Sequence, residues 1–165
     1  MGRSRLAIVI PARNEEKTIK KVVLSLKDYG DILVVDDASR DNTKIILNKL
    51  KTKVIRNQKN LGYEGTLLKG IKYCLKKNYQ YIATFDADDE HDSKFFKNVL
   101  KLKNFDLLIG KRSKFNRISE YFFSFITKLF FNFEDPLSGL KIYNTQILKK
   151  IKLKNENLLN VYIIF

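Results

Sequence analysis

The sequence Tyr-Ile-Ala-Thr-Phe-Asp-Ala-Asp-Asp-Glu-His occupies residues 81–91. Its first five residues are apolar or β-branched, a composition typical of a short buried strand. The next six include five side chains that can bind a metal, and the carboxylates among them repel one another unless a cation lies between them. Asp86 and Asp88, at i and i+2 beside the strand end, suit a hard divalent cation with oxygen ligands. A solvated acidic turn is the alternative that this segment alone leaves open.

Further strands are predicted from apolar runs at residues 6–10, 32–35, 53–55 and 106–109. Between the strands, apolar residues recur at the helical spacing i, i+3, i+4, i+7 in residues 19–26 and 67–75, with shorter versions at 45–50 and 95–100. Strands that alternate with helices, and that are apolar on both faces, predict an α/β fold with a mostly parallel sheet covered by helices on both sides.

Three loops of this predicted fold carry the chemically distinctive residues, at 11–16, 36–43 and 86–92. They follow the first, second and fourth strands, and ligands of such sheets bind beyond the carboxyl ends of the strands. We therefore expect all three loops to meet at one edge of the sheet.

The first loop lacks the Gly-x-Gly-x-x-Gly pattern of NAD-binding folds and reads Arg13-Asn14-Glu15-Glu16. Asn14 is a candidate helix N-cap, and the two glutamates suit the positive end of the helix dipole but would repel a pyrophosphate. A phosphate held here therefore needs another partner, and a cation at Asp86 and Asp88 is the candidate.

The second loop begins with a doubled aspartate, Asp36-Asp37, at the end of a strand. A carboxylate in this place can accept hydrogen bonds from a nucleobase or from a ribose hydroxyl. The alternative is an ordinary helix cap, which Ser39 or Asp41 supplies.

The chain of 165 residues has 32 basic and 18 acidic residues, a formal net charge of +14. This excess favours anionic partners such as nucleotide phosphates, nucleic acid or an anionic membrane face, although a basic surface also serves solubility alone. Because the acids gather in a few loops, we expect a cation site within a positive field. The single cysteine, Cys74, lies on the apolar face of a predicted helix; we expect a buried thiol and no disulfide, which fits a reducing compartment.

No long apolar run precedes Leu6, so we expect no signal peptide. No window reaches the roughly 20 apolar residues of a spanning helix; the nearest, residues 121–133, is interrupted by Lys128. The aromatic-rich segment 115–133 predicts either an amphipathic helix packed on the sheet or a helix at a membrane surface.

Six segments in order then resemble family 2 glycosyltransferases of the GT-A fold, over residues 6 to about 143. The nearest branch resembles the dolichyl- or polyprenyl-phosphate sugar synthases, because Asp-x-x-Ser-Gly-Leu-Lys after a basic segment is typical of them. The segments are Ile10-Pro11-Ala12-Arg13-Asn14-Glu15-Glu16, the loop 34–43, Asn60-Leu61-Gly62, Asp86-Ala87-Asp88, Ile109-Gly110-Lys111-Arg112 and Asp135-Pro136-Leu137-Ser138-Gly139-Leu140.

The resemblance implies a role for each matching residue. Mn²⁺ or Mg²⁺ would be held by Asp86, Asp88 and Glu90, with Asp88 catalytic. Arg112 and Arg117 would bind an acceptor phosphate, and Asp135 would be a catalytic base where the acceptor is a hydroxyl. The donor site would consist of Pro11, Arg13, Glu15, Val35, Asp37, Asp86 and Ala87.

By the same resemblance the chain is one glycosyltransferase domain, with a nucleotide-sugar-binding half at 1–111 and an incomplete acceptor-side half at 112–165. The family continues beyond the equivalent of Phe165, which makes C-terminal truncation an expectation. The implied activity is inverting, metal-dependent transfer from a nucleotide-diphosphate sugar to a polyprenyl phosphate, in the cytoplasm or peripherally on its membrane face.

Several alternatives remain open at this point. The acceptor can instead be a hydroxyl of a growing surface glycan, or the chain can be a donor-binding remnant without turnover. A nucleotidyltransferase would show a glycine- and lysine-rich phosphate loop after the first strand, which is absent here. Aspartates at the binding edge argue against a nucleic-acid partner. The sequence does not indicate an oligomeric state.

Overall fold

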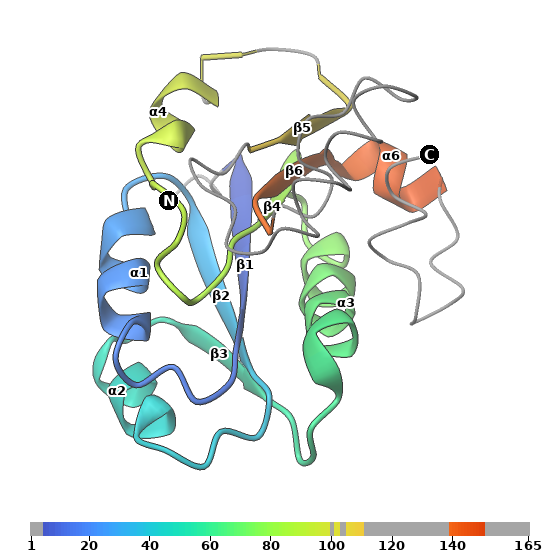
Figure 1. The fold of residues 1–165 in the computed structure, drawn as a ribbon. Helices are drawn as coiled ribbons and strands as arrows, with labels where there is room; N and C mark the ends of the chain where they lie inside the picture. The colour runs from blue at the N-terminus through green and yellow to red at the C-terminus, as the bar shows by residue number, and fades with distance from the viewer. Residues whose placement is uncertain (1–4, 100, 103–104, 111–138, 151–165) are drawn as a thin grey trace, which may run out of the picture.

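The computed structural model describes residues 5–99, 101–102, 105–110 and 139–150. These residues form one six-stranded sheet of order β3-β2-β1-β4-β6-β5 (Figure 1). The strands are β1 (Leu6–Ala12), β2 (Asp31–Asp36), β3 (Lys53–Arg56), β4 (Tyr81–Thr84), β5 (Leu107–Ile109) and β6 (Lys141–Asn144). The α/β fold and the mostly parallel sheet predicted from the sequence are confirmed.

The central pairings are parallel, with β1 between β2 and β4. The sequence analysis did not predict β6, which is antiparallel to both of its neighbours and separates β5 from β4. Only Ile142 and Tyr143 of its four residues are apolar, and the pairing with β4 and β5, rather than an apolar run, makes them a strand.

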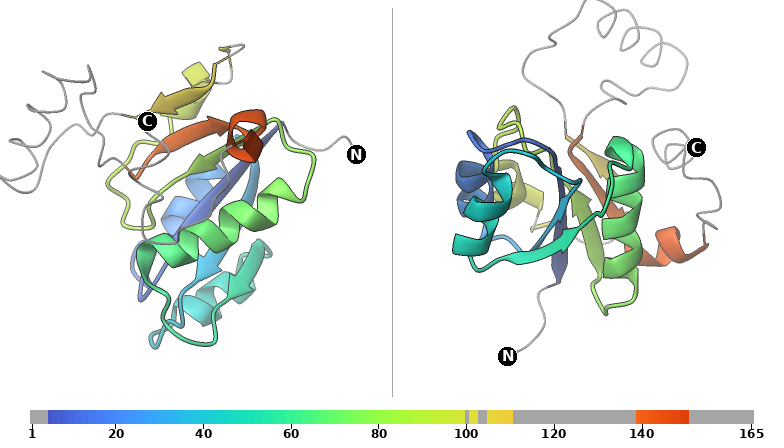
Figure 2. Two further views of the ribbon diagram at one scale, coloured as in Figure 1. Left: turned by 90° about the vertical axis from the view of Figure 1, so that its right-hand side faces the viewer. Right: turned by 90° about the horizontal axis from the view of Figure 1, so that it is seen from below.

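Five helices of the described chain lie on the two faces of this sheet (Figure 2). On one face, apolar side chains of α1, α2 and α4 pack on Leu6, Ile8 and Ile10 of β1. On the other, side chains of α3 pack on Ala7 and Val9, and α6 adds Leu148 to the same cluster beside β6. The alternation along β1 buries both of its faces, as expected for a central parallel strand. The helices are α1 (Ile19–Leu26), α2 (Thr43–Lys49), α3 (Gly62–Leu75), α4 (Phe95–Val99) and α6 (Thr145–Lys150).

The long helix α3 lies very close to the sheet at Gly70. A Cβ atom on Gly70 would lie 2.4 Å from Val9 Cγ1 and 3.0 Å from Val35 Cγ2, so a side chain there would push the helix outward. This close packing fixes the first turn of α3 at the carboxyl edge of the strands, beside the loops that the sequence analysis singled out.

Cys74 is buried on the inner face of α3, as predicted. Burial raises the pKa of its thiol to about 12, so the thiol stays protonated and packs as an apolar group. Across the described residues, none of the helices combines the length and apolar character that crossing a bilayer requires.

Candidate functional site

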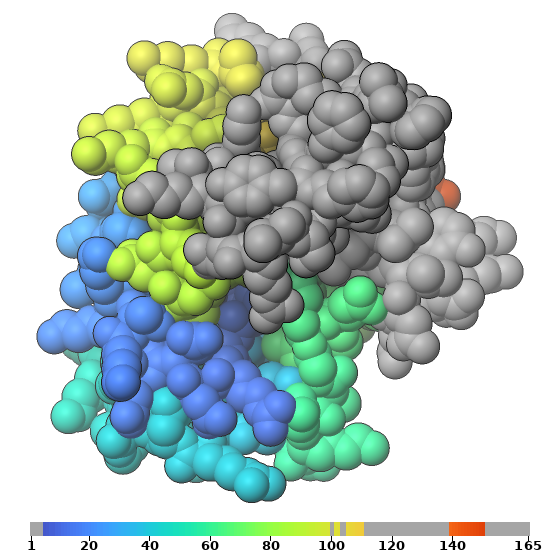
Figure 3. All heavy atoms as spheres, viewed as in Figure 1, coloured from blue at the N-terminus to red at the C-terminus, as the bar shows by residue number. Residues whose placement is uncertain are grey.

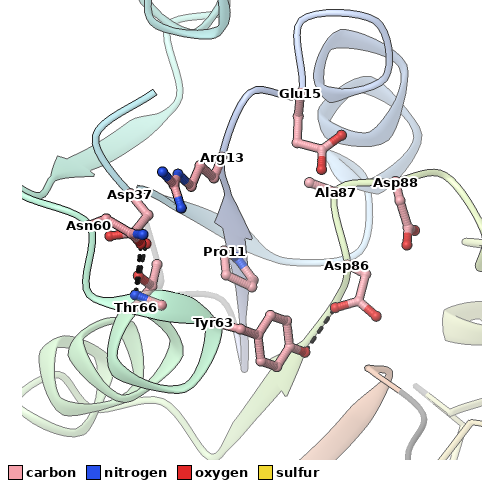
Figure 4. A pocket seen from close by; sticks show the side chains of 11 residues that line it. Pro11, Arg13, Glu15, Asp37, Asn60, Tyr63, Thr66, Asp86, Ala87 and Asp88 are labelled. Carbon is pink, nitrogen blue, oxygen red and sulfur yellow. Dashed lines mark hydrogen bonds between the residues drawn. The ribbon is translucent and has the colours of Figure 1, made fainter. Parts of the chain in front are cut away.

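A cavity of about 350 Å³ opens at the carboxyl edge of β1, β2 and β4 (Figure 4). The three loops predicted to meet do meet there, and the turn before α3 completes the wall. The lining residues are Pro11, Arg13, Glu15, Asp37, Asn60, Gly62, Tyr63, Thr66, Asp86, Ala87 and Asp88.

Most of the residues that the resemblance implied therefore surround one cavity, but two do not line it. Val35 is fully buried, and its side chain packs toward α3 beside Gly70. Glu90 lies in the same loop as Asp88 but is not among the lining residues. The candidates Arg112, Arg117 and Asp135, and the aromatic segment 115–133, lie outside the described residues.

The lining carries four carboxylates, of Glu15, Asp37, Asp86 and Asp88, against the single guanidinium of Arg13. This is the reverse of the whole chain, whose net charge is +14. In Figure 4 Asp37 lies at one end of the cavity and Asp86 and Asp88 at the other, with Pro11 between them. An anionic ligand is repelled by such a lining unless a cation accompanies it.

The loops after β1 and β2 are joined by reciprocal hydrogen bonds, and we call residues 13–16 and 39–43 the loop zipper. The amides of Asn14, Glu15 and Glu16 donate to the side chains of the second loop: Ser39 Oγ at 3.0 Å, Thr43 Oγ1 at 2.8 Å and Asp41 Oδ2 at 3.0 Å. In the other direction, the Arg40 amide donates to Asn14 Oδ1 and the Asn42 amide to Glu16 Oε2.

The prediction that Asn14 caps the first helix was wrong. Asn14 is not a helix N-cap, because α1 begins at Ile19, five residues after Asn14, with Thr18 in the cap position. Asn14 instead adopts a left-handed backbone conformation, with φ of 57°, which asparagine tolerates better than most residues. That conformation presents its side chain to the second loop.

Asp37 is buried and accepts hydrogen bonds from Asn57 Nδ2 and from the amides of Leu61 and Gly62, at 2.8–3.0 Å. Burial raises the pKa of Asp37, but these hydrogen bonds, with one from Thr66, outweigh it and hold the pKa below its ordinary value of 3.8. The carboxylate has about four acceptor positions, so the chain's own donors use most of them. Asp37 therefore orders the glycine turn that precedes α3.

Asn57 is oriented in turn by Lys69 of α3, whose ammonium group donates to Asn57 Oδ1 at 2.7 Å. The Asn57 amide nitrogen donates to Asp37 and to Thr66. This chain of contacts joins the end of β3, the end of β2 and helix α3 beneath the cavity floor. Neither Asn57 nor Lys69 stands out in the sequence, because the pattern around them is that of an ordinary loop and an exposed helix face.

We call residues 85–92 the acid loop. Within it, Asp86 Oδ1 accepts a hydrogen bond at 2.8 Å from the phenol of Tyr63 (Figure 4). Asp88 Oδ1 accepts one from the Glu90 amide at 3.0 Å. Asp89 points elsewhere and forms an ion pair with Lys21 of α1, against which the loop lies (Figure 3). Asp86 and Asp88 are thus the two carboxylates of this loop that face the cavity.

Within the described residues, no three His, Cys, Asp or Glu side chains form a group that could hold a metal by themselves. Two carboxylates at the cavity wall nevertheless suit Mg²⁺ or Mn²⁺, which often take one or two protein carboxylates and complete their shell with substrate phosphates and water. The donor chemistry of Asp86 and Asp88 therefore fits a divalent cation that binds together with a phosphate ligand.

Four lining residues were not predicted as site residues: Asn60, Gly62, Tyr63 and Thr66. Asn60 and Gly62 were part of one segment of the family resemblance, but no role was assigned to them. Thr66 is buried on α3, where an apolar-periodicity argument finds no signal. In the sequence, Tyr63 is an aromatic residue of a helix with no sign of a role in the site. Its contact with Asp86 arises from the fold, which places it opposite the acid loop.

The fold of the described residues is shared with solved structures of other proteins. Glucosyl-3-phosphoglycerate synthase from Mycobacterium tuberculosis, solved with Mn²⁺ and uridine-diphosphate-glucose, has the same fold at a TM-score of 0.66 and 22% identity. The match covers 88% of this chain and 57% of that one. The described chain therefore has the GT-A fold that the sequence resemblance implied.

Residues 7–150 match the sequence profile of glycosyl transferase family 2, and the chain therefore belongs to that family. One relative is an uncharacterised protein of Methanocaldococcus jannaschii, 34% identical over 168 residues, covering 92% of this chain and 69% of the relative. Another is the UDP-N-acetylglucosamine–dolichyl-phosphate N-acetylglucosaminyltransferase of Methanococcus voltae, 30% identical over 190 residues, covering 90% and 73%.

Proposed function

We propose that this glycosyltransferase moves a sugar from a nucleotide-diphosphate donor to a polyprenyl phosphate, with inversion at the anomeric carbon and with a divalent cation. The observation that carries the proposal is the cavity lined by four carboxylates and one guanidinium. A nucleoside diphosphate is strongly anionic, so this lining receives it only together with a cation.

In this proposal Asp86 and Asp88 would hold Mn²⁺ or Mg²⁺. When bound, the cation would supply positive charge that stabilises the leaving nucleoside diphosphate. Arg13 supplies the one positive side chain of the lining. Glu90, which is not among the lining residues, would take part only through water or after a rearrangement of the loop.

The nucleoside end of the donor would occupy the wall between Pro11 and Asp37. Glu15, whose backbone amide donates to Thr43 in the loop zipper, and Ala87 also line the cavity, on the side of Asp88 (Figure 4). Asp37 provides negative charge for the donor groups of a base, at the edge of the turn that it also orders. Val35, whose side chain is buried, would contribute only its backbone to this wall.

A polyprenyl phosphate is favoured as the acceptor by the name of the Methanococcus voltae relative. A phosphate acceptor is already an anion and attacks the face of the sugar opposite the leaving group without a general base. The domain would then work at the cytoplasmic face of a membrane, with the half at 112–165, including Arg112 and Arg117, on the acceptor side. Transfer to a glycan hydroxyl, with Asp135 as base, is the second candidate.

Two measurements in sequence test the proposal. A thermal-shift panel of UDP-, GDP- and CMP-sugars, each with Mn²⁺ and with EDTA, identifies the donor. Transfer of the labelled sugar from that donor is then followed with a polyprenyl phosphate in detergent and with a glycan acceptor. We expect a Mn²⁺-dependent shift for one base and label in the lipid fraction. Label in the glycan alone would overturn the proposal that a polyprenyl phosphate is the acceptor. Donor binding without any sugar transfer would identify a donor-binding remnant.

A further inference from the structure

Three segments far apart in the sequence converge on one carboxylate, that of Asp86. Tyr63, in the first turn of α3, donates to Oδ1. His91, at the end of the acid loop, places Nε2 3.6 Å from Oδ2. Gly139, just before β6, packs so closely that a Cβ atom on it would lie 1.6 Å from Oδ2. Asp86 is therefore held between these three groups at the wall of the cavity.

His91 is unusual among these neighbours. Its side chain is only 3% exposed, and in the part of the chain that the structure describes its Nε2 is the buried side-chain atom without a hydrogen-bond partner. Leaving a buried polar atom unpaired costs about 1–3 kcal/mol. The ring packs edge-on against Phe85 at 5.7 Å, a contact that an apolar ring would make equally well. Stability alone therefore does not account for an imidazole here.

Tyr63 makes a different kind of contact. The side chain of Tyr63 belongs to neither hydrophobic core cluster, so the core does not need this hydrogen bond. Burial of the phenol group and the adjacent Asp86 carboxylate raise the pKa of Tyr63, which keeps the hydroxyl protonated and able to donate. The bond crosses from α3 to the acid loop, and thus joins the glycine turn to the carboxylate pair.

We propose that Tyr63 and His91 are positioning residues that hold the Asp86 carboxylate in the orientation in which it and Asp88 receive a divalent cation. The inference rests on the proposed function, since it assumes that a cation binds at these carboxylates. Groups that orient a metal ligand from behind typically change metal affinity about 10- to 100-fold when removed. Without them, the carboxylate turns freely and the pair is no longer preorganised.

The experiment measures Mn²⁺ binding in the presence of the donor nucleoside diphosphate, from the loss of the free Mn²⁺ electron paramagnetic resonance signal. Tyr63→Phe removes only the hydroxyl, and His91→Phe replaces the unpaired nitrogen by carbon. We expect about 10-fold weaker Mn²⁺ binding in each, the lower end of the usual range because Tyr63 is partly exposed. The metal-free melting temperature of His91→Phe should equal or exceed that of the wild type, because an unsatisfied buried group is removed.

Two further variants separate positioning from packing. His91→Gln carries an N–H near the place of the imidazole Nε2 and should recover most of the Mn²⁺ affinity. Tyr79→Phe removes a similar phenol-to-aspartate hydrogen bond, of 2.9 Å to Asp31, at the opposite edge of the sheet, and should leave Mn²⁺ binding unchanged.

Wild-type Mn²⁺ affinity in both Tyr63→Phe and His91→Phe would overturn the inference while leaving the proposed function intact. A loss in one variant alone would overturn it for the other residue. A wild-type protein that takes up no Mn²⁺ with any nucleoside diphosphate would overturn the proposed function and the inference with it. If His91→Phe does not fold, His91→Leu takes its place, because leucine also removes the nitrogen. Wild-type Mn²⁺ affinity in His91→Leu would overturn the role of His91.

Discussion

The two ends of the cavity differ in how their polar groups are satisfied. At the nucleoside end, the loop zipper and Asp37 are paired almost entirely within the chain. At the other end, His91 Nε2 in the acid loop has no hydrogen-bond partner among the described residues, and Asp88 accepts a hydrogen bond from the Glu90 amide. The first end is complete without a ligand, whereas the second brings like charges together that a cation would relieve. Substitutions should therefore cost stability at the first end and ligand affinity at the second.

The largest effect is expected from Asp88→Asn. Loss of one of two cavity carboxylates should weaken Mn²⁺-dependent nucleotide binding by about 100-fold or more, above the range for residues that only orient a ligand. The melting temperature should stay within a few degrees of the wild type, because Asp88 supports little of the fold. Calorimetric titration of the protein with the nucleotide in the presence of Mn²⁺ measures this affinity in the wild type and in the variant.

Asp89→Asn is the matched control for this change. It removes the same charge one residue away, from a carboxylate that pairs with Lys21 and does not line the cavity. Asparagine also tolerates the left-handed backbone of this position, with φ of 65°. Equal losses in the two variants would mean that the acid loop acts through its overall charge rather than through Asp88.

Gly139→Ala should give the next largest effect. Its Cβ would overlap Asp86 Oδ2, so the carboxylate must move, and we expect at least about 10-fold weaker Mn²⁺ binding. Gly65→Ala is the control, because its Cβ meets only Leu61 Cβ, at 3.2 Å, within a helix that alanine favours. Unchanged Mn²⁺ affinity in Gly139→Ala would show that the close approach of Gly139 to Asp86 does not matter.

At the nucleoside end, Asp37→Asn should lower the free energy of unfolding at pH 7 by about 2–3 kcal/mol, the value of hydrogen bonds to a charged group. Because the pKa of Asp37 is lowered in the folded state, its stabilisation is complete above the ordinary value of 3.8 and is lost as the pH falls below it. Urea unfolding between pH 6 and pH 3 should therefore show a shallower decline for the variant. Parallel pH profiles would contradict the role given to Asp37.

The smallest effect is expected from Thr43→Val, which keeps the shape of a fully buried side chain but removes the acceptor of the Glu15 amide. We expect a loss of about 1–2 kcal/mol in urea unfolding. Ser39→Ala removes a comparable but exposed acceptor, of the Asn14 amide, and should cost about 0.5 kcal/mol or less. A larger loss for Ser39→Ala than for Thr43→Val would contradict the account of the zipper.

Much of the fold follows from local patterns in the sequence. Ile19, Val22, Val23 and Leu26 are buried as their spacing predicts, and the loops after β1, β2 and β4 share one edge because those strands are parallel. Strand β6 was missed because its pairing comes from distant residues: Lys141 and Ile142 lie opposite Thr84 and Ala83. A strand that depends on its neighbours leaves no periodic signal of its own.

The site was predictable where charge and position coincide, as in Asp86 and Asp88, which line one cavity with Asp37. It was not predictable where a side chain acts across the fold. Tyr63 reaches Asp86 over 23 residues of sequence, and Lys69 supports Asp37 only through Asn57. The prediction of a helix cap at Asn14 failed because asparagine is equally common as a helix cap and in a left-handed turn.

The central claim is that this cavity takes a nucleoside diphosphate only through a cation at Asp86 and Asp88. Crystals grown with Mn²⁺ and the donor nucleoside diphosphate, measured at the manganese absorption edge, test it directly. The account predicts an anomalous peak in contact with the Asp86 and Asp88 carboxylates and with the diphosphate. Nucleotide bound in the cavity with no manganese peak beside these carboxylates would contradict it.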